Sequence, residues 1–211
     1  MDLFELKKEQ YKLANRIILR DGFSSVKTIG GTACVELQGQ ILACVVVCEF
    51  PSMVLKEKKF YVLNDPLPYR QDLVAFREVP ALIEAFNLLD EDPDIIFVHG
   101  SGILHPRRVG LASHLGLVLN KPTIGVDEKL SFGQVENGKI VIDNDIKGFE
   151  VTTKEFAYPI YVSPGHLITL GSALRLITES IKYPHKMPEP LHLAHKIGKK
   201  EGKGMRMKNG I

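Results

Sequence analysis

The sequence is poor in cysteine, with only three in 211 residues. Cys34, Cys44 and Cys48 form an odd set without a C-x-x-C pair, which argues against a disulfide framework and a structural zinc site. We therefore expect reduced thiols and a cytoplasmic protein. Cys34 and Cys44 are expected to lie opposite each other in a hairpin, as packing residues. The charged N-terminus, MDLFELKKEQ, is unlike a secretory signal peptide.

Long hydrophobic runs and a strong net charge are also missing. No apolar stretch approaches the roughly 20 residues that a membrane-spanning helix needs, so no membrane partner is expected. The formal net charge of +2 is too small to indicate a nucleic-acid partner by itself. Positive charge gathers in residues 199–208, KKEGKGMRMK, which fit either a solvated end or a basic arm that contacts phosphates. We interpret residues 1–197 as one domain and residues 198–211 as a basic, flexible tail.

The hydrophobic patterns predict an α/β fold. A helix over residues 2–19 is followed by three hairpin-linked strands near 26–37, 41–50 and 53–63. The charged KEKK in the third strand predicts an edge position. Helical and strand patterns then alternate, ending with a helix over 164–181 and a short helix after it. This order predicts a ribonuclease-H-like fold, a mixed sheet with three antiparallel hairpin-linked strands, parallel additions and helices on both faces.

The stretch IIFVHGSGILHPRR, residues 95–108, draws attention to one end of this sheet. Its first residues predict a buried strand that ends at His99, and a glycine-rich turn follows. Sites in α/β enzymes commonly lie where such a strand meets such a turn. The stretch therefore predicts a functional site built around the turn.

Five motifs, in order along the chain, resemble the endonuclease V family: PYRQDLVAFRE, GSGILHPRRVGLASHLG, KPTIGV, YVSPGHL and PEPLHLAH. The resemblance runs from about residue 27 to residue 195. It implies a metal-dependent nuclease that recognises deaminated bases, mainly inosine, and cuts one phosphodiester beyond the lesion. A divalent cation, Mg²⁺ or Mn²⁺, would be the cofactor. The partner would be DNA or RNA, single-stranded or containing inosine, and a monomer is favoured.

The resemblance also implies roles for individual residues. Glu78 matches an acidic metal ligand, Tyr69 matches a wedge at the lesion, and His166 would donate a proton or position water. The pocket for a flipped base would be formed by Gly100, Ser101, Gly102, Ile103 and Leu104. Contacts to phosphate, or alternatively ordering of the turn, would come from His105, Arg107 and Arg108.

Three positions depart from the family pattern. The strand that should end in a metal-binding aspartate has Ala33 there, and His99 replaces the aspartate expected before the glycine-rich turn. The Ala-Lys pair expected after PTIGV is replaced by Asp127 and Glu128, with Lys129 one place further on. Because Mg²⁺ prefers oxygen ligands, Glu78 and His99 alone predict a degenerate metal site.

Other carboxylates could in principle compensate. Glu128 or Asp127 could supply a carboxylate from the neighbouring strand, whereas Glu36 should face away from position 33 because strand side chains alternate. Two hypotheses follow. One is a nucleic-acid-binding protein with weak, metal-altered or lost cleavage, and the other is an active endonuclease with a rearranged site. A nucleotide-binding module is a third hypothesis.

Overall fold

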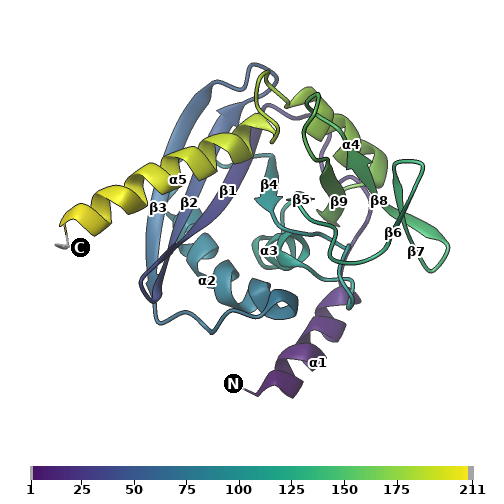
Figure 1. The fold of residues 1–211 in the computed structure, drawn as a ribbon, viewed down its shortest axis with the longest axis horizontal. Helices are drawn as coiled ribbons and strands as arrows, with labels where there is room; N and C mark the ends of the chain where they lie inside the picture. The colour runs from purple at the N-terminus through teal and green to yellow at the C-terminus, as the bar shows by residue number, and fades with distance from the viewer. Residues whose placement is uncertain (1, 209–211) are drawn as a thin grey trace.

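One mixed sheet of nine strands, in the order β3-β2-β1-β4-β5-β9-β8-β7-β6, organises the computed structural model, which describes residues 2–208 (Figure 1). The strands are β1 (Thr28–Leu37), β2 (Gln40–Glu49), β3 (Leu55–Asn64), β4 (Ile95–His99), β5 (Thr123–Asp127), β6 (Gln134–Glu136), β7 (Lys139–Ile142), β8 (Asp145–Val151) and β9 (Ile160–His166). The helices are α1 (Leu3–Ala14), α2 (Val74–Asn87), α3 (Leu111–Leu119), α4 (Leu170–Glu179) and α5 (Glu189–Lys208), with a 3-10 turn, η1, at Gln71–Leu73.

The first three strands form the predicted antiparallel hairpins. β1 and β2 are joined by a tight turn in which Gly39 has a φ of +81°, a left-handed conformation that glycine adopts without steric cost. β3 carries KEKK and lies at the edge of the sheet, as predicted. β4 adds parallel to β1, and β5 adds parallel to β4. The predicted ribonuclease-H-like arrangement is therefore confirmed.

Helices cover both faces of the sheet (Figure 1). On one face, α4 and α5 pack over a hydrophobic cluster that includes Ala33, Phe97 and Leu191. On the other face, α2 and α3 pack over a cluster that includes Val45, Val98 and Leu115. β2 contributes to both clusters, which explains why its sequence is almost continuously apolar.

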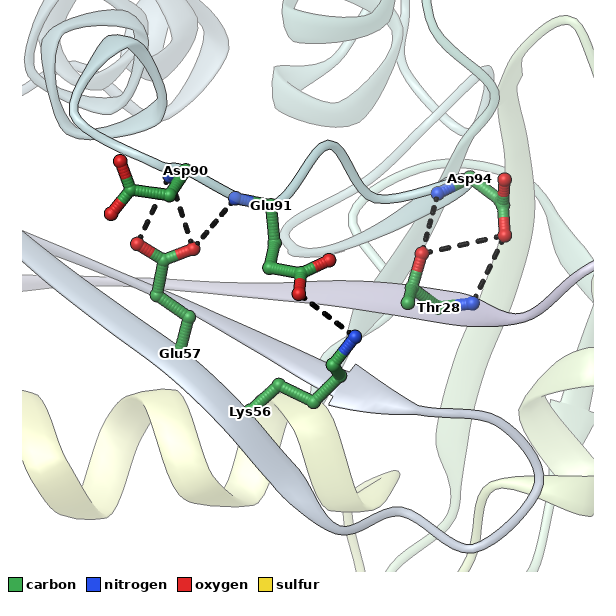
Figure 2. A network of polar contacts seen from close by, with 6 residues as sticks. All are labelled: Thr28, Lys56, Glu57, Asp90, Glu91 and Asp94. Carbon is green, nitrogen blue, oxygen red and sulfur yellow. Dashed lines mark hydrogen bonds and ion pairs between the residues drawn. The ribbon is translucent and has the colours of Figure 1, made fainter.

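Polar contacts hold the starts of β1 and β4 together (Figure 2). The Asp94 carboxylate accepts hydrogen bonds from the Thr28 backbone N–H at 3.0 Å and from the Thr28 hydroxyl at 3.3 Å. Glu57 of β3 accepts from the backbone N–H groups of Asp90 and Glu91, in the loop before β4. This network secures the end of the sheet opposite His99, since β1 and β4 run parallel.

Residues 198–208, which we interpreted from the sequence as a basic tail, form the last part of α5, a helix that runs from Glu189 to Lys208. A Cβ atom at Gly198 would lie 3.1 Å from the Cβ of Cys44, and one at Gly202 would lie 3.1 Å from Leu37. Glycines four residues apart therefore let the helix backbone approach β1 and β2 closely. The packing of this face holds the segment in place. Residues 209–211 lie outside the described part.

Two further predictions about local structure were wrong. The helix expected over 164–181 begins only at Leu170, because β9 continues to His166 and Thr169 caps α4. Cys34 lies opposite Ala43 rather than Cys44, because the hairpin register is one residue tighter than assumed. The two thiols therefore point to opposite faces of the sheet.

Candidate nucleic-acid-binding site

β1 and β4 diverge toward their carboxyl ends, and we call the region between the diverging strands the crevice. Their parallel pairing ends at Gly31 and Phe97, although β1 continues to Leu37. Continuing that register would place Ala33 level with His99, so the two positions where the family pattern places aspartates lie across the crevice from each other. This is the carboxyl end of β4, where α/β folds place their sites.

A cavity of about 340 Å³ lies beside the crevice. Its lining comes from α1, β1, the segment before α2, α2 itself, the end of β4, the glycine-rich turn, the start of α3, and the end of β5 with the loop after it. The lining residues are Gln10, Cys34, Tyr69, Gln71, Asp72, Val74, Ala75, Glu78, His99, Gly100, Ser101, His105, Val109, Gly110, Leu111, Asp127, Lys129 and Ser131. The structure thus brings Glu78, His99, Tyr69 and part of the glycine-rich turn together.

Glu78 extends from α2 toward Cys34 of β1. Burial raises the pKa of the Glu78 carboxyl to about 7, while the Cys34 thiol and Arg77 lower it by less. The pKa of the Cys34 thiol is also raised, by burial first and then by the adjacent Glu78, so this thiol is not an activated nucleophile. Glu36 faces the same side but binds Arg77 with both of its oxygens, at 2.6 Å, and offers the crevice no free carboxylate.

The raised pKa of Glu78 predicts a pH-dependent stability. The folded state holds this proton more tightly than the unfolded state does, so the free energy of unfolding should fall as pH rises from about 4.5 to about 7. We expect Glu78→Gln to remove this loss and to be more stable than wild type at pH 8, by roughly 3 kcal/mol at most. Urea unfolding from pH 4 to pH 8 measures the difference. Glu84→Gln, at an exposed position on the same helix, should follow wild type, and parallel profiles for Glu78→Gln and wild type would contradict the assignment.

His99 faces α5, where its ring lies 6.3 Å from the ring of His195 in an edge-on arrangement. Its Nε2 atom is 3.9 Å from the Glu128 carboxylate, which also accepts a hydrogen bond from Lys186 at 3.0 Å. Glu128 does not line the cavity, whereas its neighbours Asp127 and Lys129 do. Glu128 is therefore held outside the cavity by an ion pair.

The glycine-rich turn is fixed by backbone contacts to two strands. Gly100 donates its N–H to Val126 of β5, and Gly102 donates its N–H to the Ser163 hydroxyl of β9, both at 2.9 Å. Gly100 and Ser101 line the cavity, while Gly102 supports it from behind. Ile103 and Leu104 are buried, and Leu104 packs in a separate cluster with residues of β7. Only the first part of the predicted base pocket therefore faces the cavity.

His105 and Arg107 join the turn to the segment before α2. The Nδ1 atom of His105 accepts the Arg107 N–H, and its Nε2 atom lies 3.1 Å from the Asp72 carbonyl. Burial, and then the adjacent Arg107 charge, lower the pKa of His105 to about 4, so it is neutral at pH 7. Arg107 binds the Asp72 carboxylate at 2.7 Å and the Gln10 side chain of α1. This geometry supports ordering of the turn, while Arg108 is more exposed and pairs with Asp143.

His166 lies at the end of β9 and does not line the cavity. Its Nδ1 atom accepts a hydrogen bond from the Ile18 backbone N–H at 3.2 Å, which ties the segment after α1 to the sheet. Burial, with a smaller effect of Arg16, lowers the pKa of this imidazole. The structure does not bring His166 together with Glu78 and His99. Tyr69, by contrast, lines the cavity with 67% of its surface exposed.

The fold and the site define a ribonuclease-H-like α/β protein with a cavity at the carboxyl end of its central strands. The family model described as Endonuclease V matches residues 11–196. Endonuclease V of Dictyoglomus thermophilum is 35% identical over 205 residues, which cover 93% of this chain and 89% of that relative. The chain belongs to the endonuclease V family.

Solved structures agree with this assignment. The endonuclease V of Ciona intestinalis, a D234N variant bound to a 23mer DNA containing an inosine followed by a ribo-adenosine, aligns with a TM-score of 0.88. It is 27% identical, and the match covers 96% of this chain and 98% of that one. Endonuclease V of Bacillus subtilis aligns with a TM-score of 0.88 at 28% identity, covering 99% of this chain and 95% of that chain. Within residues 2–208, no helix is long and apolar enough to span a bilayer.

The family consists of metal-dependent nucleases, but the residues present do not fit a magnesium centre. Among the described residues, no group of three or more His, Cys, Asp and Glu side chains is placed to hold a metal ion. Ala33 supplies no ligand atom, His99 supplies nitrogen, and Glu78 is a single carboxylate with a raised pKa. Mg²⁺ prefers oxygen ligands in near-octahedral geometry.

Sequence reasoning missed several residues of the site. His195 lies in the PEPLHLAH motif, but its approach to His99 depends on how α5 crosses the sheet. Asp127, which the sequence offered as an alternative to Glu128, lines the cavity together with Lys129, whereas Glu128 does not. No signal in the sequence pointed to Gln10 or Asp72, because α1 reaches the cavity only through tertiary packing.

Proposed function

We propose that this protein binds inosine-containing DNA or RNA at the cavity and that phosphodiester cleavage is weak, altered in its metal dependence or lost. Features that suit binding and features that disfavour metal-dependent cleavage occur together at the crevice. The cavity, Tyr69 and the ordered glycine-rich turn are present, while Ala33 and His99 stand where metal-binding carboxylates are expected. Binding and cutting thus depend on different residues.

The shape of the cavity supports recognition of a flipped base. Gly100 and Ser101 present backbone at the wall, and close approach of backbone suits hydrogen bonding to the edge of a base. Tyr69 is exposed at the same cavity, where its ring can stack against the neighbouring base pair or nucleotide. The Ciona protein bound to inosine-containing DNA makes inosine the first ligand to test.

A divergent endonuclease is the second candidate. Asp127 and Glu78 line the same cavity and could form the basis of a rearranged site. This candidate differs from the first in its expected rate of phosphodiester cleavage. Metal-assisted hydrolysis needs a cation that activates water and neutralises the leaving oxygen, so rapid cleavage requires that the rearranged site hold a metal ion.

Binding and cleavage should therefore separate in experiment. We expect fluorescence anisotropy to show at least tenfold tighter binding of a single strand containing inosine than of one containing guanosine, in EDTA. In Mg²⁺, the same strand should remain uncut in a gel assay. Tyr69→Ala should reduce the preference, whereas Tyr11→Ala, at an exposed tyrosine of α1, should retain it. Rapid Mg²⁺-dependent cutting would favour the divergent endonuclease, and equal binding of both strands would overturn the proposal.

A further inference from the structure

Three aromatic side chains stand almost fully in solvent on two loops. Phe156 is 100% exposed and Tyr158 is 86% exposed, both in the loop between β8 and β9. Tyr183, which is 93% exposed, lies in the loop between α4 and α5. We call these three residues the aromatic platform. Large aromatic side chains exposed to this degree on two loops are a candidate interaction surface.

The two loops are joined directly. The Thr153 hydroxyl donates a hydrogen bond to the Lys186 carbonyl at 2.6 Å, which ties the β8–β9 loop to the α4–α5 loop. Each loop is also closed by its own backbone turn, from Ala157 to Lys154 in the first and from His185 to Lys182 in the second. The platform is therefore carried by two connected turns.

A short chain of contacts leads from these loops to the cavity. The Lys186 ammonium binds the Glu128 carboxylate at 3.0 Å, and the other oxygen of Glu128 is 3.9 Å from His99. His99 lines the cavity. These contacts connect the two loops of the platform to the edge of the cavity.

Two features of the platform match a nucleic-acid strand. Lys154 precedes Phe156 by two residues and Lys182 precedes Tyr183 by one; both lysines are exposed, as is the intervening Glu155, and neither lysine forms an ion pair among the described residues. Phe156 has a φ of 59°, a left-handed conformation that a bulky residue rarely adopts, and it lies in the turn closed by the Ala157 N–H and the Lys154 carbonyl. Aromatic rings interleaved with lysines bind single strands by stacking bases and neutralising phosphates.

We propose that the aromatic platform stacks unpaired nucleotides of the strand whose modified base occupies the cavity. This inference rests on the proposed function. Its occupant is single-stranded DNA or RNA of any sequence, because every base has a face that can stack. The platform would lengthen the footprint of the protein beyond the lesion without adding specificity for it.

The absence of tryptophan from the sequence allows a direct test. Phe156→Trp introduces a single tryptophan on the platform, and its emission should be quenched when a base stacks on it. Phe4→Trp, at an exposed position near the N-terminus of α1, is the matched control; in Figure 1, α1 lies away from α4 and from the start of α5. We expect a thymidine oligonucleotide carrying one inosine to quench the first variant and to leave the second unchanged.

A second pair of variants measures the contribution to binding. Phe156→Ala with Tyr158→Ala should weaken binding of a long single strand by roughly tenfold. Binding of a strand truncated to a few nucleotides around the inosine should not change. A platform tryptophan that stays unquenched while anisotropy reports a saturated complex would overturn the inference.

The outcomes also separate this inference from the proposed function. Quenching by strands with and without inosine, at equal affinity, would support the platform while contradicting recognition of the lesion. Tighter binding of the inosine strand together with an unquenched platform tryptophan would support recognition of the lesion and contradict the platform. The rings could instead join two copies of the protein, which light scattering would show as a mass that rises with protein concentration for wild type but not for Phe156→Ala. If added strands did not compete with this self-association, the nucleic-acid assignment would be overturned.

Discussion

A variant that carries both Ala33→Asp and His99→Asp is expected to bind Mn²⁺ at least tenfold more tightly than wild type. The parallel register of β1 and β4 places the two positions level across the crevice, and Glu78 lines the adjoining cavity. Two added carboxylates would supply the oxygen ligands that the site lacks. Isothermal titration calorimetry with Mn²⁺, and then Mg²⁺, measures the change.

The control for this variant is Ala33→Asn with His99→Asn, which has nearly the same size and no charge. Because Ala33 is only 2% exposed, the folding of each variant should be checked by circular dichroism before titration. A metal titration equal to that of wild type in a folded double-aspartate variant would mean that the lost ligands are not these two. Cleavage of inosine-containing strands by the double-aspartate variant would be the stronger positive result, because it requires the metal in a productive position.

Gly102→Ala is expected to disrupt the site and to lower the free energy of unfolding by about 3 kcal/mol or more. A Cβ atom at this position would lie 2.1 Å from the Pro164 carbonyl oxygen and 2.6 Å from its carbon, which are backbone atoms of β9. Because a backbone cannot move aside as a flexible side chain can, the turn must shift away from the sheet. Urea unfolding and anisotropy with the inosine strand should both report the change.

Gly171→Ala is the matched control for this substitution. A Cβ atom at Gly171, in the first turn of α4, would meet nothing within 4 Å. Alanine there should stabilise the helix slightly or leave it unchanged, since it lowers the entropy of the unfolded chain. Equal stability of the two variants would show that the glycine-rich turn tolerates displacement and is not a rigid wall of the cavity.

Local patterns in the sequence were enough to predict the sheet. β2 reads as a continuous apolar strand because it lies between two hydrophobic clusters, and β3 reads as an edge strand because its KEKK segment remains in contact with water. These signals depend only on which side chains are removed from water on folding, and that tendency is a property of each residue type. The predicted start of the helix at residue 164 was wrong, because β9 continues through Pro164 and Gly165 to His166 and α4 begins only after the Thr169 cap.

The position of α5 could not be predicted from its composition. Its lysines are typical of a solvated end, but Gly198 and Gly202 let the helix lie against β1 and β2. Glycines can destabilise a helix or let it pack closely against a neighbouring element. Which effect dominates here depends on the sheet surface that β1 and β2 provide. The same dependence brings His195 beside His99.

The sequence by itself determined the three hairpin-linked strands and the family, and it predicts that Ala33 and His99 stand where the family pattern has aspartates. Tertiary structure decided which residues meet: Glu78 faces Cys34, Arg107 is held by Asp72 and Gln10, and His166 supports the chain near Ile18 outside the cavity. The physical reason is that burial and local patterning are properties of short segments. The partner of a charge or a hydrogen-bonding group is set by the packing of segments far apart in the chain.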